Sequence, residues 1–125
     1  ALYAGARLLE LLSLEGELPS AELFAELPES VSTPEIRVPV AEGTGPELME
    51  RIVAAADTLP GPARMTRIDG LRVDFSDGWG LVRASNTEPC LTLRFEGEDE
   101  ASLERIRGHF RELLRATAAE LELPF

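Results

Sequence analysis

The residues best suited to chemistry lie in one short run, Arg83-Ala84-Ser85-Asn86-Thr87-Glu88-Pro89. Arginine offers a planar fork of N–H donors that matches phosphate oxygens, and short hydroxyls, an amide and free backbone N–H groups add further donors. Pro89 stiffens the end of the run and lowers the cost of ordering it. The run therefore predicts a phosphate clamp, although composition alone also allows a plain polar turn with Arg83 at a solvated strand end.

Two predicted strands hold this run in place. Residues 80–84 lead into it, and residues 91–95 lead out of it. The second strand alternates with a period of two, which is typical of a half-buried strand. Its apolar face carries Leu91, Leu93 and Phe95. Its polar face carries Arg94, which is therefore a candidate to support Arg83 from beside the loop.

The remaining elements predict a mixed fold. Strands are expected at 36–40, 65–68 and 71–75, with Pro39 favouring an edge position for the first. Helices are expected at 44–56 and 99–121, and the second has its apolar stripe at Leu103, Ile106, Phe110, Leu113 and Leu114. The pattern predicts an α+β domain whose mostly antiparallel sheet has four to five strands, with helices on one face.

A boundary is expected near residue 30, where Pro28 and Pro34 bracket a stretch without periodicity. Residues 1–30 are interpreted as a helical tail of a preceding domain plus a hinge, and residues 31–125 as the domain that holds the loop. The first predicted helix, ending near Gly16, has more apolar residues than one face needs, which indicates a helix from another domain's core. The chain also lacks an initiator Met, which suggests a piece of a longer protein.

Charge and composition exclude several classes of partner. Acidic residues number 23 against 12 basic ones, so the net charge is −11, and such a surface repels nucleic acid and anionic membranes. Cys90 is the only cysteine, which excludes an internal disulfide and fits a reducing cytoplasm. No apolar run approaches the roughly 20 residues of a membrane span.

The aspartates at 69, 74 and 77 lack a ligand spacing, so no metal site is expected. His109 is expected to be solvated.

The sequence around the loop resembles the C-terminal (fourth) domain of the α-D-phosphohexomutases, in particular the bacterial phosphomannomutase/phosphoglucomutase group. The resemblance rests on Gly78-Trp79-Gly80-Leu81-Val82-Arg83, on the Ser-Asn-Thr-Glu-Pro run at 85–89 and on Leu91-Thr92-Leu93-Arg94-Phe95-Glu96. It implies a TATA-binding-protein-like fold. It also implies a function, which is to hold the phosphate of a phosphosugar that is not being transferred, using Arg83, Ala84, Ser85, Asn86 and Thr87.

The resemblance further implies an enzyme that interconverts hexose 1-phosphates and 6-phosphates through a bisphosphorylated intermediate. Its nucleophilic Ser loop, its Asp-Gly-Asp-Gly-Asp run for Mg²⁺ and its sugar-binding loop have no counterpart in these 125 residues. The phosphoserine and Mg²⁺ are therefore expected in other domains of a parent chain. This chain alone is expected to be inactive and to bind phosphosugars and those domains, closing over their active site.

Two alternatives stay open. One is the same domain of a phosphoglucosamine mutase, in which the resemblance implies a glycine at the position of Asn86; asparagine therefore favours the mannose/glucose group. The other is a non-catalytic acidic α+β interaction module whose loop only shapes a turn.

Overall fold

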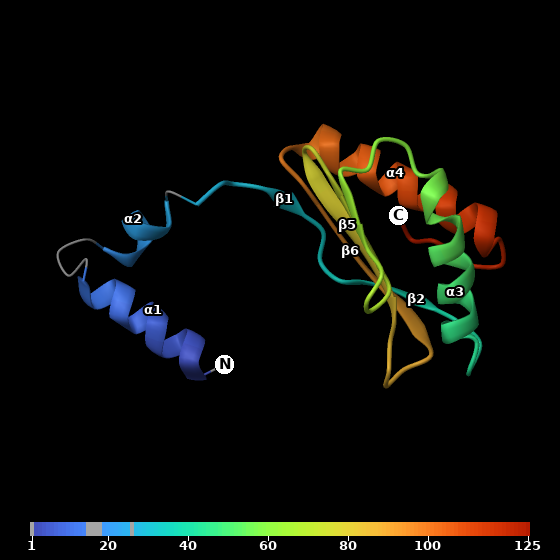
Figure 1. Cartoon of the computed structure of the whole chain (residues 1–125), viewed down its shortest axis with the longest axis horizontal. Helices are drawn as coiled ribbons and strands as arrows, with labels where there is room; N and C mark the ends of the chain where they lie inside the picture. The colour runs from blue at the N-terminus through green and yellow to red at the C-terminus, as the bar shows by residue number, and fades with distance from the viewer. Residues whose placement is uncertain (1, 15–18, 26) are drawn as a thin grey trace.

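The computed structural model describes residues 2–14, 19–25 and 27–125. Along the chain the elements are α1 (Leu2–Leu14), α2 (Ser20–Phe24), β1 (Val31–Ser32), β2 (Ile36–Pro39), α3 (Gly45–Ala55), the short 3-10 helix η1 (Ala56–Thr58), β3 (Arg64–Thr66), β4 (Leu71–Phe75), β5 (Gly78–Ala84), β6 (Cys90–Gly97) and α4 (Glu100–Thr117). Figure 1 shows α3 and α4 on one face of the sheet, here called the helix face. The opposite face is called the open face.

The sheet is antiparallel throughout, in the order β1-β6-β5-β4-β3, and β2 also pairs with β6. β1 and β2 lie along the same edge of β6, because Val31 pairs with Gly97 and Ile36 with Leu93. Thr33 bridges the gap between them. Its N–H donates to the Phe95 carbonyl at 3.0 Å, and its hydroxyl accepts the Phe95 N–H at 3.1 Å.

The predicted fold class is confirmed: α+β, antiparallel, with helices on one face. The sheet has six strands where four to five were expected, because β1 adds a short segment to the edge that β2 occupies. β1 is only two residues long, too short to show a period in the sequence. The strand predicted at 65–68 is found at Arg64–Thr66.

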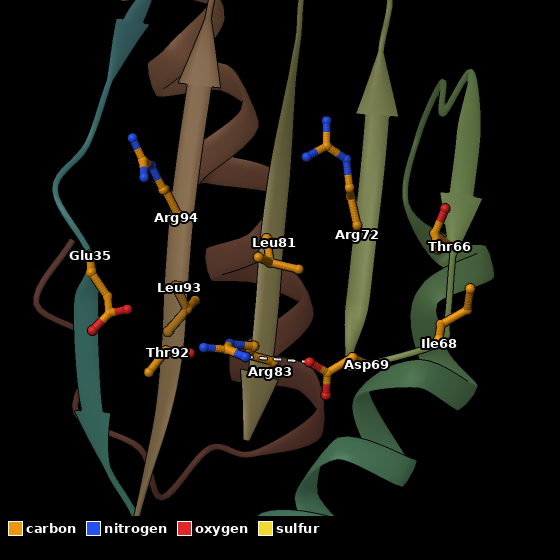
Figure 2. A pocket seen from close by; sticks show the side chains of 10 residues that line it. All are labelled: Glu35, Thr66, Ile68, Asp69, Arg72, Leu81, Arg83, Thr92, Leu93 and Arg94. Carbon is orange, nitrogen blue, oxygen red and sulfur yellow. Dashed lines mark hydrogen bonds and ion pairs between the residues drawn. The ribbon is translucent and has the colours of Figure 1, made fainter. Parts of the chain in front are cut away.

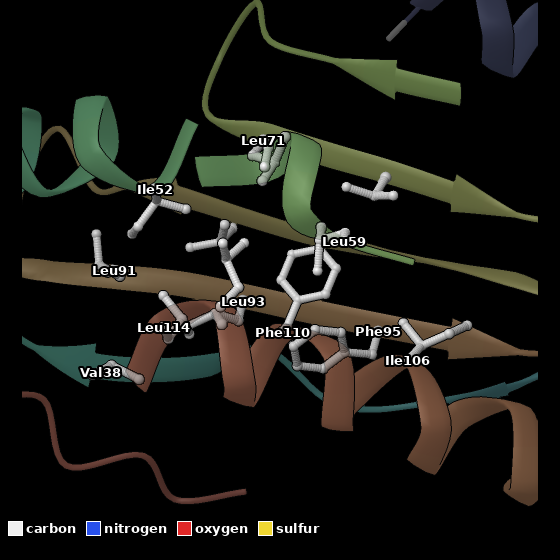
Figure 3. Close-up of a cluster of buried hydrophobic side chains, with 14 of the residues drawn as sticks. Val38, Ile52, Leu59, Leu71, Leu91, Leu93, Phe95, Ile106, Phe110 and Leu114 are labelled. Carbon is white, nitrogen blue, oxygen red and sulfur yellow. The ribbon is translucent and has the colours of Figure 1, made fainter. Parts of the chain in front are cut away.

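The hydrophobic core fills the space between the helix face and the helices α3 and α4 (Figure 3). Alternate residues of the strands point into it, as the period of two predicts. Phe95 and Phe110 meet edge to face with ring centroids 5.2 Å apart. Gly80 makes room for this pair, since a Cβ there would lie 2.4 Å from the Phe110 ring. Fully buried members of the core include Ile52, Leu71, Val73, Val82, Leu91, Phe95, Ile106, Phe110 and Leu114.

Helix α4 has the stripe that its sequence predicts. All five apolar positions, Leu103, Ile106, Phe110, Leu113 and Leu114, are buried. Asp99 caps its start by accepting the Ser102 N–H at 2.7 Å, and this bond lowers the pKa of the Asp99 carboxyl.

The end of α4 differs from the prediction, because the helix stops at Thr117 and not near residue 121. Ala118 leaves the helical conformation with φ −150° and ψ 60° and is buried. The chain then turns back, so that Phe125 packs on Phe95 with ring centroids 5.2 Å apart. Arg111 Nε donates to the Phe125 carbonyl at 2.7 Å. Breaking the helix thus lets the apolar tail join the core instead of extending into water.

His109 corrects another expectation. The prediction of a solvated histidine is wrong, because the ring is half-buried and packs against Phe75 with centroids 5.6 Å apart. Burial and the nearby Arg105 guanidinium lower the pKa of His109. Arg105 and the Phe75 ring both lie on the helix side of the sheet, and His109 of α4 contacts both of them.

Helix α1 has no buried residue, in contrast to α3 and α4. Leu2 is 94% exposed and Leu14 74%, so the apolar excess predicted from the sequence lies at the surface. The predicted end of this helix near Gly16 falls outside the described residues. No described helix combines the length and apolar character needed to cross a membrane.

Candidate phosphate-binding site

The loop between β5 and β6 is held together by its own side chains. The chain leaves β5 at Ala84 and re-enters the sheet at Cys90, where the Ser85 N–H donates to the Cys90 carbonyl at 2.9 Å. Ser85 Oγ accepts the backbone N–H of Glu88 at 3.2 Å and, more weakly, that of Thr87 at 3.4 Å. A serine that bonds to the backbone two and three residues on is a common way to close a tight turn. The Ser85 hydroxyl therefore braces the loop that it belongs to.

The far side of the loop is anchored to β2. The Val40 N–H donates to the Pro89 carbonyl at 2.9 Å, and Arg37 pairs with Glu88 at 2.6 Å. Arg37 also pairs with Glu35 at 3.0 Å; hydrogen bonds and charge from these two carboxylates raise the pKa of Arg37. The loop is thus tied at both ends, which leaves Asn86 and Thr87 exposed at its tip.

Arg83 extends from the last part of β5 onto the open face. It lines a hollow of about 450 Å³, here called the open-face hollow, whose walls also include Thr66, Ile68, Asp69, Arg72, Leu81, Thr92 and Arg94. Figure 2 shows Arg83 and Asp69 pointing toward one another, while Arg72 and Arg94 point to the other end of the hollow. Arg83 Nη1 lies 3.3 Å from Asp69 Oδ2. Arg72 pairs with Asp74 at 2.7 Å and stacks 4.1 Å above the Trp79 ring.

Ser85, Asn86 and Thr87 line a second hollow of about 240 Å³, here called the loop hollow. Its other wall is formed by residues 40–43 and by Gly45 and Pro46 at the start of α3. A Cβ at Gly45 would lie 3.4 Å from that of Ala84, so this helix end packs closely on the end of β5. Free N–H groups and the helix dipole make a helix N-terminus favourable for anions. The start of α3 thus adds positive potential beside the loop, whereas Glu42 and Glu88, which line the same hollow, add negative charge.

The structure therefore divides the residues predicted for the site. It brings Ser85, Asn86 and Thr87 together around the loop hollow, with half-buried Ala84 at its root. It places Arg83 in the open-face hollow, paired with Asp69, and places exposed Arg94 in the same hollow. Sequence reasoning missed Asp69 as the partner of Arg83 and missed the wall formed by residues 40–46.

The described residues contain no group of three His, Cys, Asp or Glu side chains that could hold a metal ion. Asp69 and Asp74 pair with arginines on the open face, and Asp77 pairs with Arg105 of α4. The three aspartates thus serve as counter-ions for arginines. Cys90 is buried at the start of β6, as a small core residue would be.

Comparisons with known proteins show which family the chain belongs to. Residues 35–113 match the family described as phosphoglucomutase/phosphomannomutase, C-terminal domain. A phosphomannomutase/phosphoglucomutase of Pseudomonas syringae is 48% identical over 124 residues, 99% of this chain and 26% of that protein. A phosphoglucomutase of Neisseria gonorrhoeae is 47% identical over 116 residues, 92% of this chain and 25% of that protein.

A more distant relative is a probable phosphoglucosamine mutase of Methanopyrus kandleri, 34% identical over 94% of this chain and 25% of that protein. Among solved structures, a phosphoglucomutase/phosphomannomutase family protein from Burkholderia thailandensis superposes with a TM-score of 0.82 at 41% identity, covering 99% of this chain and 25% of that one. The chain thus spans about a quarter of the length of these relatives. By the extent of these matches, the chain belongs to the phosphoglucomutase/phosphomannomutase family and corresponds to its C-terminal domain.

Proposed function

We propose that this chain is the phosphate-binding C-terminal domain of a phosphomannomutase/phosphoglucomutase that interconverts hexose 1-phosphates and 6-phosphates through a bisphosphorylated intermediate. The observation that carries the proposal is the donor-rich loop at the β5–β6 connection, which lies within the residues that match the family domain. In this proposal the loop holds the phosphate that is not being transferred. The substrates are phosphosugars of glucose and mannose.

The chemistry of the site suits a phosphate dianion. Thr87 and Asn86 are exposed at the loop tip, where a hydroxyl and an amide can donate to phosphate oxygens. The N-terminus of α3 lines the same hollow and favours a negative charge there, which opposes the repulsion from Glu42 and Glu88. Arg83 contributes a charge-assisted bidentate pair, roughly twice as strong as a neutral hydrogen bond. Arg94 lines the same open-face hollow from the next strand and adds positive charge there, although its side chain points to the other end of the hollow.

Phosphoryl transfer itself is assigned to other domains of a parent chain. A metal ion supplies charge neutralisation in such a reaction, and the described residues here offer no donor set for it. The proposed tasks of this chain are to bind one phosphate and to exclude water as the domain closes over the cleft. Catalysis by this chain alone is not expected.

The proposed closing motion turns about the segment before β1. We propose that residues 1–30 belong to the preceding domain and the hinge, and that residues 31–125 move as the phosphate-binding domain. Two features support this division: α1 buries none of its residues, and pairing with the sheet begins at Val31. The exposed leucines of α1 would then pack inside that preceding domain.

The mannose/glucose substrate is favoured over glucosamine because the relatives named for the former are 44–48% identical and the probable phosphoglucosamine mutase 34%. Assaying a parent chain on glucosamine 6-phosphate beside mannose 6-phosphate separates the two. A non-catalytic interaction module would bind none of these phosphosugars.

The proposal is tested by ¹H–¹⁵N NMR titration of the 125-residue chain with glucose 1-phosphate, mannose 1-phosphate and free mannose. We expect saturable shifts at 84–87 with both phosphosugars and none with mannose. Arg83→Ala should abolish them without changing stability by more than about 0.5 kcal/mol, because the side chain is exposed.

The matched control is Arg115→Ala, which removes the same charge from an exposed position on α4. It should leave the titration unchanged. Equal shifts with free mannose, or full binding by Arg83→Ala, would overturn the proposed clamp.

A further inference from the structure

We propose that Asp69 is a counter-ion that holds Arg83 on the open face, and that a phosphate entering the loop must take Arg83 over from it. The proposal rests on the proposed function of the loop and adds a means of regulating its affinity. Asp69 would act as a positioning residue, since it would touch Arg83 and not the substrate. The Asp69–Arg83 contact is called the resting pair below.

The resting pair has the geometry of an exchangeable ion pair. A single contact joins the two groups, from Arg83 Nη1 to Asp69 Oδ2 at 3.3 Å. The side chains keep 44% and 70% of their surface exposed, respectively. Exposed pairs of this kind contribute little, typically below about 1 kcal/mol, so a stronger anion can displace the carboxylate. Bidentate pairing with a phosphate is such a competitor.

The backbone fixes Asp69 at this place. Gly70 follows it with φ +91°, and a Cβ there would lie 2.3 Å from the Val82 carbonyl oxygen and 2.7 Å from Arg83 Cβ. Only glycine fits so close to β5 in this conformation. The turn before β4 is therefore pressed against the residue that carries the guanidinium, and Leu71 pairs with Val82 in register. The strand register and the close approach of Gly70 thus fix the backbone of Asp69 beside Arg83.

The position of Arg83 determines how the resting pair would affect phosphate affinity. With Asp69 as partner, Arg83 lines the open-face hollow, whereas Ser85, Asn86 and Thr87 line the loop hollow. A phosphate at the loop must draw the guanidinium toward itself and away from the carboxylate. Asp69 also repels a phosphate that comes near it. Both effects lower phosphate affinity, which would help a reaction in which a bound intermediate has to be released and turned.

Asp74 offers a matched control on the same face. Its side chain pairs with Arg72 at 2.7 Å. In the sheet Asp74 lies opposite Trp79 of β5, four residues before Arg83. Asp74→Asn removes the same charge from another arginine-paired aspartate without touching the resting pair. A general gain in positive potential would act in both variants, while release of Arg83 would act only in Asp69→Asn.

The experiment compares wild type, Asp69→Asn and Asp74→Asn as full 125-residue chains. Affinity is measured by NMR titration with inorganic phosphate and with glucose 1-phosphate. We expect Asp69→Asn to bind both ligands about two- to fivefold more tightly than wild type, as loss of an exposed competing pair implies. Asp74→Asn should stay near the wild-type value. Equal tightening in both variants, or no tightening in Asp69→Asn, would overturn the proposal.

A second readout needs no ligand. The heteronuclear NOE of Arg83 Nε should be higher in wild type and in Asp74→Asn than in Asp69→Asn, because only Asp69→Asn removes the partner of Arg83. An unchanged NOE would overturn the resting pair itself. If the NOE falls as expected but no chain binds phosphate, the resting pair stands, while the phosphate clamp and the exchange both fail.

Discussion

The two faces of the sheet are made from alternate residues of the same strands, yet they differ in almost every physical property. On the helix face, Val82 and Leu91 have no exposed surface and pack under α3 and α4. On the open face, Arg83 and Arg94 stay exposed beside half-buried Leu81. The helix face therefore carries stability, and the open face can carry charge that burial would forbid. A substitution on the helix face should therefore lower stability more than a similar substitution on the open face.

The largest difference in stability is expected when leucine is replaced by alanine once on each face. Leu91→Ala should lower the free energy of unfolding by about 2–5 kcal/mol, because it opens a cavity in the core. Leu81→Ala should cost about 1 kcal/mol or less, since its side chain already meets solvent on the open face. Urea denaturation measures both. Equal losses would mean that the open face is covered as fully as the helix face.

A smaller effect is expected where Gly80 approaches the helix layer. Gly80→Ala places a Cβ 2.4 Å from the Phe110 ring, so either the ring or α4 must shift, at a cost of about 1–3 kcal/mol. Gly108→Ala is the matched control, because nothing lies within 4 Å of its added Cβ. In the middle of α4 it should stabilise by about 0.5–1 kcal/mol. Thermal unfolding should therefore move in opposite directions; a destabilising Gly108→Ala would contradict this packing.

The smallest effect concerns the half-buried histidine of the helix layer. Its pKa is lowered from the ordinary value of 6.5, first by burial and then by Arg105, with Glu112 acting in the opposite sense. The unfolded chain thus binds the proton more readily, so the free energy of unfolding should fall as pH drops below about 6.5. His109→Gln should flatten this dependence between pH 7.5 and 5.5. Equal slopes in both proteins would show that His109 does not contribute.

Much of this architecture could be predicted from local pattern. The structure confirms the period of two in residues 91–95, the apolar stripe of α4 and the presence of a loop between two strands. Each of these features depends on neighbours within a few residues. The sequence did not predict β1, because a strand of two residues is too short to show an alternating pattern. The roles of Arg83, Ser85, Asn86 and Thr87 as phosphate ligands stay a prediction.

The sequence by itself determined the fold class, the family and the loop, since alternation, capping and turn residues are local properties of the chain. Only the tertiary structure decided that Arg83 rests on Asp69, 14 residues away, and that the loop faces the start of α3. It also decided that His109 lies against Phe75 and that the tail after Thr117 returns to Phe95. These contacts join residues through strand register and helix packing, which depend on how whole elements meet, so no short stretch of sequence encodes them.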